Sequence, residues 1–334
     1  MQLLLFAALA LGATAVTWKG SEWLESSSAR LAAYYELPPI VQGAVIAAVG
    51  SSFPELSSVV LATLVHGEFD LGVSAIVGSA IFNILVIPAV SGFVGGRLAS
   101  DRELVYKDAQ FYITSVAVLL LAFSIAVIYK PVEGMELGGT MTRWIALLPL
   151  LLYGLYLFLQ QQDTMEYVSE EVEEDISASR QWIVLLTGLA VILVGVEGLV
   201  RAAIGLGDYF GTPSFLWGLT VIAAATSLPD AFVSIKAAQR GEGTVSMANV
   251  LGSNIFDLLV AVPVGVLIAG ATPVDYAVAA PMMGFLTLAT IILFAMMRTD
   301  LTLSRAECVV LLVLYGVFVA WMVLETAGLT AVVT

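Results

Sequence analysis

The chain has 334 residues, of which 60% are hydrophobic and 12% charged, and its mean hydropathy is +0.97. Soluble domains carry about 25% charged residues, so this composition excludes a soluble domain and indicates an integral membrane protein. The formal net charge of −14 is largely local, because seven of the 27 acidic residues lie between positions 163 and 175. Cys308 is the only cysteine, so no intramolecular disulfide can form, and it lies in an apolar run.

Apolar stretches of about 20 residues, the length that spans a bilayer, divide the chain into about ten predicted helices. They lie near residues 2–17, 38–64, 71–95, 104–129, 142–160, 181–203, 214–238, 244–270, 275–297 and 305–325. The first resembles the apolar core of a signal peptide, but it lacks the basic residues that such a signal needs. We therefore interpret it as a helix and predict an all-α integral membrane fold.

A motif in the second and third predicted helices recurs in the seventh and eighth, about 175 residues later. The first copy reads GSSFPE (50–55) and GSAIFN (78–83), and the second reads ATSLPD (225–230) and GSNIFD (252–257). Paired, Pro-interrupted apolar segments in the two halves of a membrane protein indicate a substrate site near the bilayer midplane. With five helices in each half, the second half enters from the opposite side, which predicts two inverted-topology repeats.

The predicted organisation is a first five-helix repeat over 1–160, an acidic linker over 161–179 and a second repeat over 180–334. Basic residues indicate the orientation, because inner loops are enriched in Lys and Arg. With the N-terminus outside, ten of the 13 basic residues fall on the inner side, and only Lys130, Arg143 and Arg201 fall outside. We therefore predict both termini outside and the linker in the cytoplasm.

Each motif combines a helix break with oxygen-bearing side chains. Pro54 and Pro229 lack an N–H, so backbone carbonyls are left without their helical partners at membrane depth. Hydroxyls, amides and carboxylates recur there at helical spacing, without a nearby His or Cys, which favours hard cations such as Ca²⁺ and Na⁺ over zinc or copper. These side chains are Ser51, Ser52, Glu55, Ser79 and Asn83 in the first half and Thr226, Ser227, Asp230, Ser253 and Asp257 in the second.

Three of these side chains, those of Glu55, Asp230 and Asp257, place a carboxylate within the membrane. A charge at the bilayer centre opposes insertion by about 2.5–3.5 kcal/mol, and no Lys or Arg lies at matching depth in the same helices. A structural carboxylate that only locks two helices together does not explain three acids in a repeated Pro context. The countercharges are therefore bound cations or protons.

At these residues the sequence resembles the cation/calcium exchanger superfamily, whose two alpha-repeats read G-[ST]-S-x-P-E and G-S-N-x-F-[ND]. The resemblance extends over nearly the whole chain in its five-plus-five arrangement, and the short linker is similar to minimal prokaryotic forms. Ala80, Asp230 and Asp257, together with His66, are most similar to the potassium-dependent sodium/calcium exchangers.

The resemblance implies an antiporter of the plasma membrane, not an enzyme, that exchanges Na⁺ for Ca²⁺ by alternating access. It implies that the first and sixth helices slide against the others, and that Glu55 and Asp230 are the central ligands, flanked by Asn83 and Asp257. Further implied ligands are the hydroxyls of Ser51, Ser52, Ser79, Thr226, Ser227 and Ser253 and the backbone carbonyls of Ala48 and Ala223. No cofactor, nucleic acid or protein partner is implied, only the transported ions and the lipid bilayer.

Several alternatives stay open. A proton-coupled exchanger of Ca²⁺ or another divalent ion usually carries G-N-x-x-E, and an intramembrane aspartyl protease carries G-x-G-D, whereas Asp230 and Asp257 read L-P-D and I-F-D. The third acid leaves one negative charge beyond what Ca²⁺ neutralises, to be met by K⁺ or by a proton. Glu197 in the sixth helix either belongs to the ion path or reaches the outer interface, and we expect His66 to be a solvated turn residue.

Overall fold

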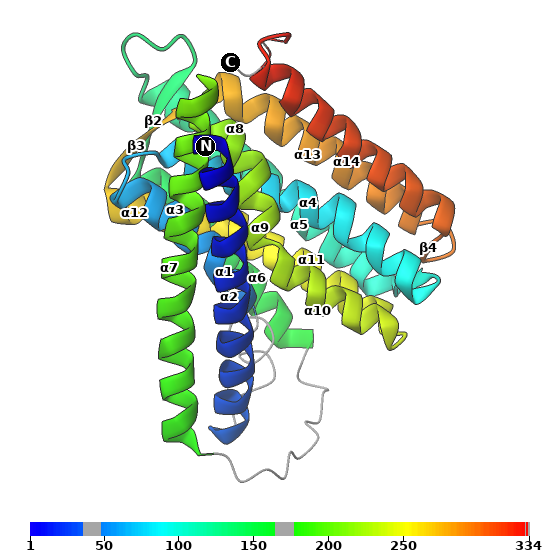
Figure 1. The fold of residues 1–334 in the computed structure, drawn as a ribbon. Helices are drawn as coiled ribbons and strands as arrows, with labels where there is room; N and C mark the ends of the chain where they lie inside the picture. The colour runs from blue at the N-terminus through cyan, green and yellow to red at the C-terminus, as the bar shows by residue number, and fades with distance from the viewer. Residues whose placement is uncertain (36–47, 164–176, 331, 333–334) are drawn as a thin grey trace.

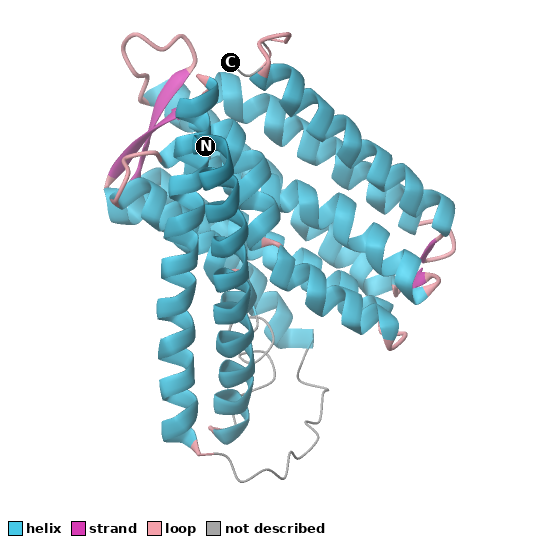
Figure 2. Cartoon of the chain, viewed as in Figure 1, coloured by secondary structure: helices cyan, strands magenta, loops and turns pink. Residues whose placement is uncertain are grey.

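The computed structural model describes residues 1–35, 48–163, 177–330 and 332, which form a helical bundle with two short β-ribbons (Figure 1, Figure 2). The first half consists of α1 (Gln2–Tyr34), α2 (Ala48–Ser51), α3 (Phe53–Leu64), α4 (Phe69–Gly95), β1 (Leu98–Ala99), the π-helix η2 (Leu104–Asp108), α5 (Ala109–Tyr129), β2 (Gly138–Thr142) and α6 (Arg143–Asp163). The second half consists of α7 (Ala178–Phe210), α8 (Ser214–Trp217), η4 (Gly218–Ile222), α9 (Ala223–Thr226), α10 (Leu228–Gln239), α11 (Gly243–Phe256), η5 (Asp257–Ala261), α12 (Val262–Ala269), β3 (Ala271–Asp275), α13 (Tyr276–Met297), β4 (Thr302–Leu303) and α14 (Arg305–Thr326).

The number of membrane-crossing helices agrees with the sequence. Among the described residues, eight helices are long and apolar enough to span a bilayer. A ninth candidate is the pair Ser214–Thr226 and Leu228–Gln239, which meet at a bend of 44°. The remaining predicted span, 38–64, starts outside the described residues and continues as α2 and α3. The predicted all-α membrane fold of about ten helices is thus confirmed.

Helices α1 and α7 are 33 residues long and run side by side in opposite directions (Figure 1). The predicted ranges 2–17 and 181–203 are too short, because each helix continues into polar sequence where the apolar run ends. At 1.5 Å per residue each helix is about 50 Å long. Small residues let the pair approach closely: a Cβ on Gly20 would lie 2.7 Å from Cγ1 of Ile192, and one on Gly188 would lie 3.0 Å from the Gly20 carbonyl oxygen.

The helices that carry the second motif of each repeat form the centre of the bundle. In the apolar 18-residue stretch of α4, 83% of the residues are buried. In the corresponding stretch of Gly243–Ala269, the segment that comprises α11, η5 and α12, 72% are buried. The other full-length spans bury 11–39% of theirs. Outer helices expose large apolar side chains such as Leu151 and Ile183, as expected of a lipid-facing surface. The polar motifs therefore lie where lipid cannot reach them.

Two antiparallel ribbons connect the halves. β1 pairs with β4, and β2 pairs with β3, and the ribbons lie at opposite ends of the bundle (Figure 2). Apolar spacing predicts helices only, and it misses these strands because each has two to five residues and lies in a loop. Each ribbon joins two loops that the predicted topology places on the same side of the membrane.

Candidate ion-binding site

The helix that carries each first motif is interrupted next to its proline. α2 and α3 are separated at Ser52, and α9 and α10 are separated at Ser227. Each proline lies in the first turn of the new helix, where a missing N–H costs no helical bond. Glu55 and Asp230 lie in the same first turns, where the helix dipole favours negative charge. Local sequence thus places one carboxylate at the start of each half-helix.

The structure brings the polar side chains of both repeats together in the centre of the bundle. All ten side chains that the sequence analysis proposes as ligands are buried. The contacts that join one repeat to the other include Ser51 Oγ to Ser253 Oγ at 3.1 Å, Ser79 Oγ to Ser227 Oγ at 2.7 Å, and the donor Asn83 Nδ2 to Asp230 Oδ2 at 3.3 Å. The site is therefore shared between the halves and is complete only when they are packed together.

The contacts follow the internal repeat. Thr226 interacts with Glu55, and its repeat equivalent Ser51 interacts with Asp230. Each carboxylate thus receives a hydroxyl from the opposite half. Ser79 adds a long hydrogen bond of 3.4 Å to Oε1 of Glu55. This reciprocity is what an inverted repeat produces when its two binding segments cross at one point.

The repeat symmetry is broken at Asn83 and Asp257. Asn83 donates a hydrogen bond to Asp230, but its repeat equivalent is Asp257, whose charge interacts unfavourably with that of Glu55. The Asn83 amide thus stabilises the Asp230 carboxylate, whereas Asp257, at the equivalent position of the second repeat, repels the Glu55 carboxylate. The pair formed by Glu55 and Asp257 requires a proton or a cation nearby.

Several buried oxygens in this region have no hydrogen-bond partner among the described residues. They are Glu55 Oε2, Asp230 Oδ1, Asn83 Oδ1, Ser52 Oγ and both carboxylate oxygens of Asp257. None of the three acids forms an ion pair with a Lys or Arg of the described chain. Buried polar groups are normally satisfied, and leaving a buried charge unpaired is strongly destabilising. Acceptors without donors are the chemistry that a hard cation meets best.

A cation bound here would use several kinds of oxygen. In the part of the chain that the structure describes, no three His, Cys, Asp or Glu side chains form a metal-binding group by themselves. Hydroxyl and amide oxygens therefore have to complete the coordination of any ion that Glu55 and Asp230 hold. Such a mixed, partly neutral ligand set suits ions that must be released again, because affinity rises with the number of charged ligands.

The two proposed backbone ligands differ in their surroundings. The carbonyl oxygen of Ala223 accepts hydrogen bonds from the Ser227 N–H at 3.1 Å and from Thr226 Oγ1 at 3.3 Å. A cation at this oxygen would have to displace the Thr226 hydroxyl. Ala48 is the first residue of α2 and follows directly on residues 36–47, which lie outside the description.

Asn254 is a supporting residue that the sequence analysis did not single out. Its Oδ1 accepts a hydrogen bond from Asn83 Nδ2 at 3.1 Å, and its Nδ2 donates to the Ala80 carbonyl oxygen at 3.3 Å and to the Tyr112 hydroxyl at 3.2 Å. Asn254 and Ala80 are repeat equivalents, so this bond also joins the halves. The sequence signal for Asn254 is the third position of the second motif, which is Ala in GSAIFN and Asn in GSNIFD.

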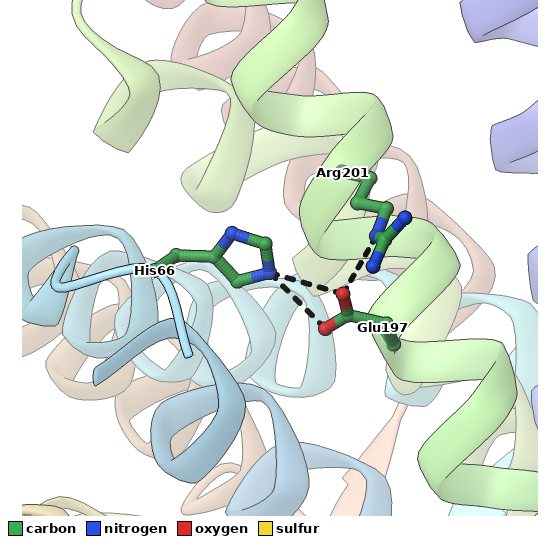
Figure 3. Close-up of polar contacts among 3 residues, drawn as sticks. All are labelled: His66, Glu197 and Arg201. Carbon is green, nitrogen blue, oxygen red and sulfur yellow. Dashed lines mark hydrogen bonds and ion pairs between the residues drawn. The ribbon is translucent and has the colours of Figure 1, made fainter. Parts of the chain in front are cut away.

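Glu197 lies in a network with His66 and Arg201 (Figure 3). Its Oε1 accepts from Arg201 Nε at 2.6 Å, and both of its carboxylate oxygens lie 3.1–3.2 Å from His66 Nε2. His66 belongs to the turn between α3 and α4, so the contact ties α7 to the rest of the bundle. The expectation of a solvated His66 is wrong, since its side chain is only 19% exposed.

Broken helices in repeated motifs, with buried oxygen-bearing side chains between them, define a membrane transporter for cations. The family described as sodium/calcium exchanger protein matches residues 5–161 and 180–324, and the chain belongs to this family.

Relatives of similar length support the assignment. An uncharacterized membrane protein of Methanocaldococcus jannaschii is 30% identical over 251 residues, which cover 74% of this chain and 76% of that protein. The sodium/calcium exchanger MaX1 of Methanosarcina acetivorans is 24% identical and covers 90% of this chain and 93% of its own. A solved structure of the sodium-calcium exchanger NCX_Mj, soaked with 10 mM Na⁺ and zero Ca²⁺, matches with a TM-score of 0.62 at 25% identity, over 95% of this chain and 99% of that one.

Proposed function

We propose that the chain is an antiporter that exchanges Na⁺ for Ca²⁺ across the plasma membrane by alternating access. The observation that carries the proposal is the group of buried acids, Glu55, Asp230 and Asp257, each of which has at least one carboxylate oxygen without a hydrogen-bond partner among the described residues. A low-dielectric site with this charge binds cations in preference to neutral solutes. The family to which the chain belongs, and the names of its relatives, support Na⁺ and Ca²⁺ as the ions.

In this proposal Glu55 and Asp230 hold Ca²⁺ between two half-helices, and Na⁺ takes their place in the alternate load. Asn83 and Asp257 flank the ion, and the hydroxyls of Ser51, Ser52, Ser79, Thr226, Ser227 and Ser253, with the carbonyls of Ala48 and Ala223, supply further oxygens. The paired helices α1 and α7 move as one unit against the remaining bundle. The glycine-lined contact between them supports this unit, because both backbones are in close contact.

We place both termini outside and the acidic linker in the cytoplasm. The distribution of Lys and Arg supports this orientation. The two ribbons support the topology, since β1–β4 and β2–β3 each join loops assigned to one side of the membrane.

The deciding experiment measures ⁴⁵Ca²⁺ uptake into proteoliposomes loaded with Na⁺. Uptake is expected when external Na⁺ is low, and it should stop when a Na⁺ ionophore collapses the gradient. Uptake that follows a pH gradient and ignores Na⁺ would overturn the proposal in favour of a proton-coupled exchanger. No uptake under any gradient, together with cleavage of a labelled helical substrate, would favour the intramembrane protease.

A further inference from the structure

A cavity of about 640 Å³ opens between α1 and α10. Its walls include Glu22 and Glu25 on α1 and Val233 and Lys236 on α10. Val233 lies three residues beyond Asp230 on the same helix, a rise of about 5 Å. The cavity therefore reaches to within one helical turn of a proposed ion ligand.

Glu25 connects this cavity with the ion site. A Cβ on Gly50 would lie 3.9 Å from the Glu25 Cα, so α1 at Glu25 packs against the helix end that presents Ser51. The charge of Glu25 also acts on Asp230. A cation at the Glu25 carboxylate would thus be close to a proposed ligand from each repeat, Ser51 in the first and Asp230 in the second.

The Glu25 carboxylate has no hydrogen bond or ion pair within the described ranges, whereas its neighbour Glu22 accepts a 2.7 Å bond from Lys19. Lys236 carries an opposing charge that acts on Glu25 electrostatically. The Lys236 ammonium nevertheless lies 4.0 Å over the ring of Phe232, where a cation–π contact holds it. The carboxylate is therefore open to a mobile cation.

We propose that Glu25 is a further cation-binding residue of the exchanger, a transit site that passes Ca²⁺ and Na⁺ between the cavity and the pair Glu55 and Asp230. Lys236 stays over the Phe232 ring and weakens cation binding at Glu25 through its positive charge. The cavity is balanced in charge, since its lining holds three acids and three bases: Glu22, Glu25, Glu242, Lys19, Lys236 and Arg240. A cation is therefore attracted to the end of the cavity where Glu25 and Asp230 act on each other. This inference rests on the proposed exchange function.

The test compares Glu25→Gln with Glu22→Gln in vesicles of known orientation. Na⁺-driven ⁴⁵Ca²⁺ transport is measured with Ca²⁺ presented at either face of the protein. We expect Glu25→Gln to raise the apparent KM for Ca²⁺ roughly three- to tenfold at the face where the cavity opens, and to leave the KM at the opposite face unchanged. Glu22→Gln should change neither KM by more than about twofold, because its charge is already paired with Lys19.

Two further variants make the outcome decisive. Glu25→Asp should have a KM close to that of the parent, because it retains the charge. Lys236→Gln should lower the KM at the cavity face, because it removes a positive charge that acts on Glu25. A Glu25→Gln variant with the parent KM at both faces, or with equal increases at both, would overturn the inference. The parent protein in the same vesicles separates this from failure of the exchange function, which would show as no Na⁺-driven transport in the parent.

Discussion

At Glu55 the proposed function depends on charge rather than on shape. Glu55→Gln keeps the side-chain volume and can still accept the bond from Ser79, but it removes the negative charge that offsets a divalent ion. We expect Na⁺-driven ⁴⁵Ca²⁺ flux to fall at least 100-fold, a loss of about 2.7 kcal/mol or more, while the variant elutes as a folded protein in size-exclusion chromatography. Asp230→Asn should behave alike.

The matched control is Glu103→Gln, an exposed acid that pairs with Lys107 at 3.3 Å. Surface pairs contribute little, so this variant should transport at the parent rate. Parent-like flux in Glu55→Gln would remove Glu55 from the site.

Asp257 decides whether a second cation is coupled to transport. Its unfavourable interaction with Glu55 is relieved either by a proton or by a monovalent ion such as K⁺. If K⁺ is bound, replacing K⁺ by choline should slow Na⁺-driven Ca²⁺ transport in the parent, and Asp257→Asn should abolish this response. A parent that transports equally in choline would instead assign the charge balance to protonation, and the rate should then depend on pH in the parent but less so in Asp257→Asn.

The sequence predicts which polar side chains lie together in the centre of the bundle, because repeated motifs at helical spacing indicate which groups share a face. It does not reveal Asn254 as the support of Asn83, nor Glu25 beside Asp230. Those relations depend on packing between segments about 170 and 205 residues apart, and no periodicity within one helix encodes them. Asp230→Glu probes the remaining geometric detail: one more methylene should alter ion affinity while exchange persists, and complete inactivity would show that the site accommodates only Asp.

Among the elements, the pair α1 and α7 is the most sensitive to added volume. In Gly20→Val even the first new carbon would meet Cγ1 of Ile192 at 2.7 Å and the Gly188 carbonyl oxygen at 2.9 Å. Overpacking of this kind costs about 1–3 kcal/mol. We expect the thermal midpoint of the detergent-solubilised protein to drop by several degrees and transport to decline.

Gly12→Val supplies the matched control on the same helix, since no heavy atom lies within 4 Å of a Cβ at Gly12. Its midpoint and transport rate should equal those of the parent. Equal behaviour of both variants would show that α1 and α7 do not need their close contact.

Element boundaries follow from the sequence only where hydropathy marks them. The helix break before Pro54 and that before Pro229 are predictable, because proline removes one helical bond and crowds the preceding turn. The extension of α1 to Tyr34 is not, since Ser and Glu residues are held in helical form there by packing against α7. The ribbons escape prediction for a related reason: strands of two to five residues gain their stability from a partner far along the chain.

For the whole molecule, alternating access requires α1 and α7 to shift against the bundle. His66 and Glu197 lie on opposite sides of that boundary (Figure 3), whereas Ala99 and Thr302 face each other within the β1–β4 ribbon. In a Cys308→Ala background, a short bifunctional thiol reagent on His66→Cys/Glu197→Cys should arrest transport. The same reagent on Ala99→Cys/Thr302→Cys should leave transport intact.

Reducing a cleavable reagent should restore transport in the first pair. Arrest by both cross-links would contradict a moving α1–α7 unit and indicate that the whole bundle has to deform. Continued transport with the first pair fully cross-linked would place the moving boundary elsewhere.

The ribbons also set an order of events during biogenesis. β1 leaves the ribosome about 200 residues before its partner β4, which at 5–20 residues per second is a delay of roughly 10–40 s. During that time the first half resides in the bilayer with an unpaired strand edge and with Glu55 lacking Thr226. A nascent chain therefore carries an uncompensated acid within the membrane until the second half arrives, and it is in this interval that it is most exposed to quality-control proteolysis.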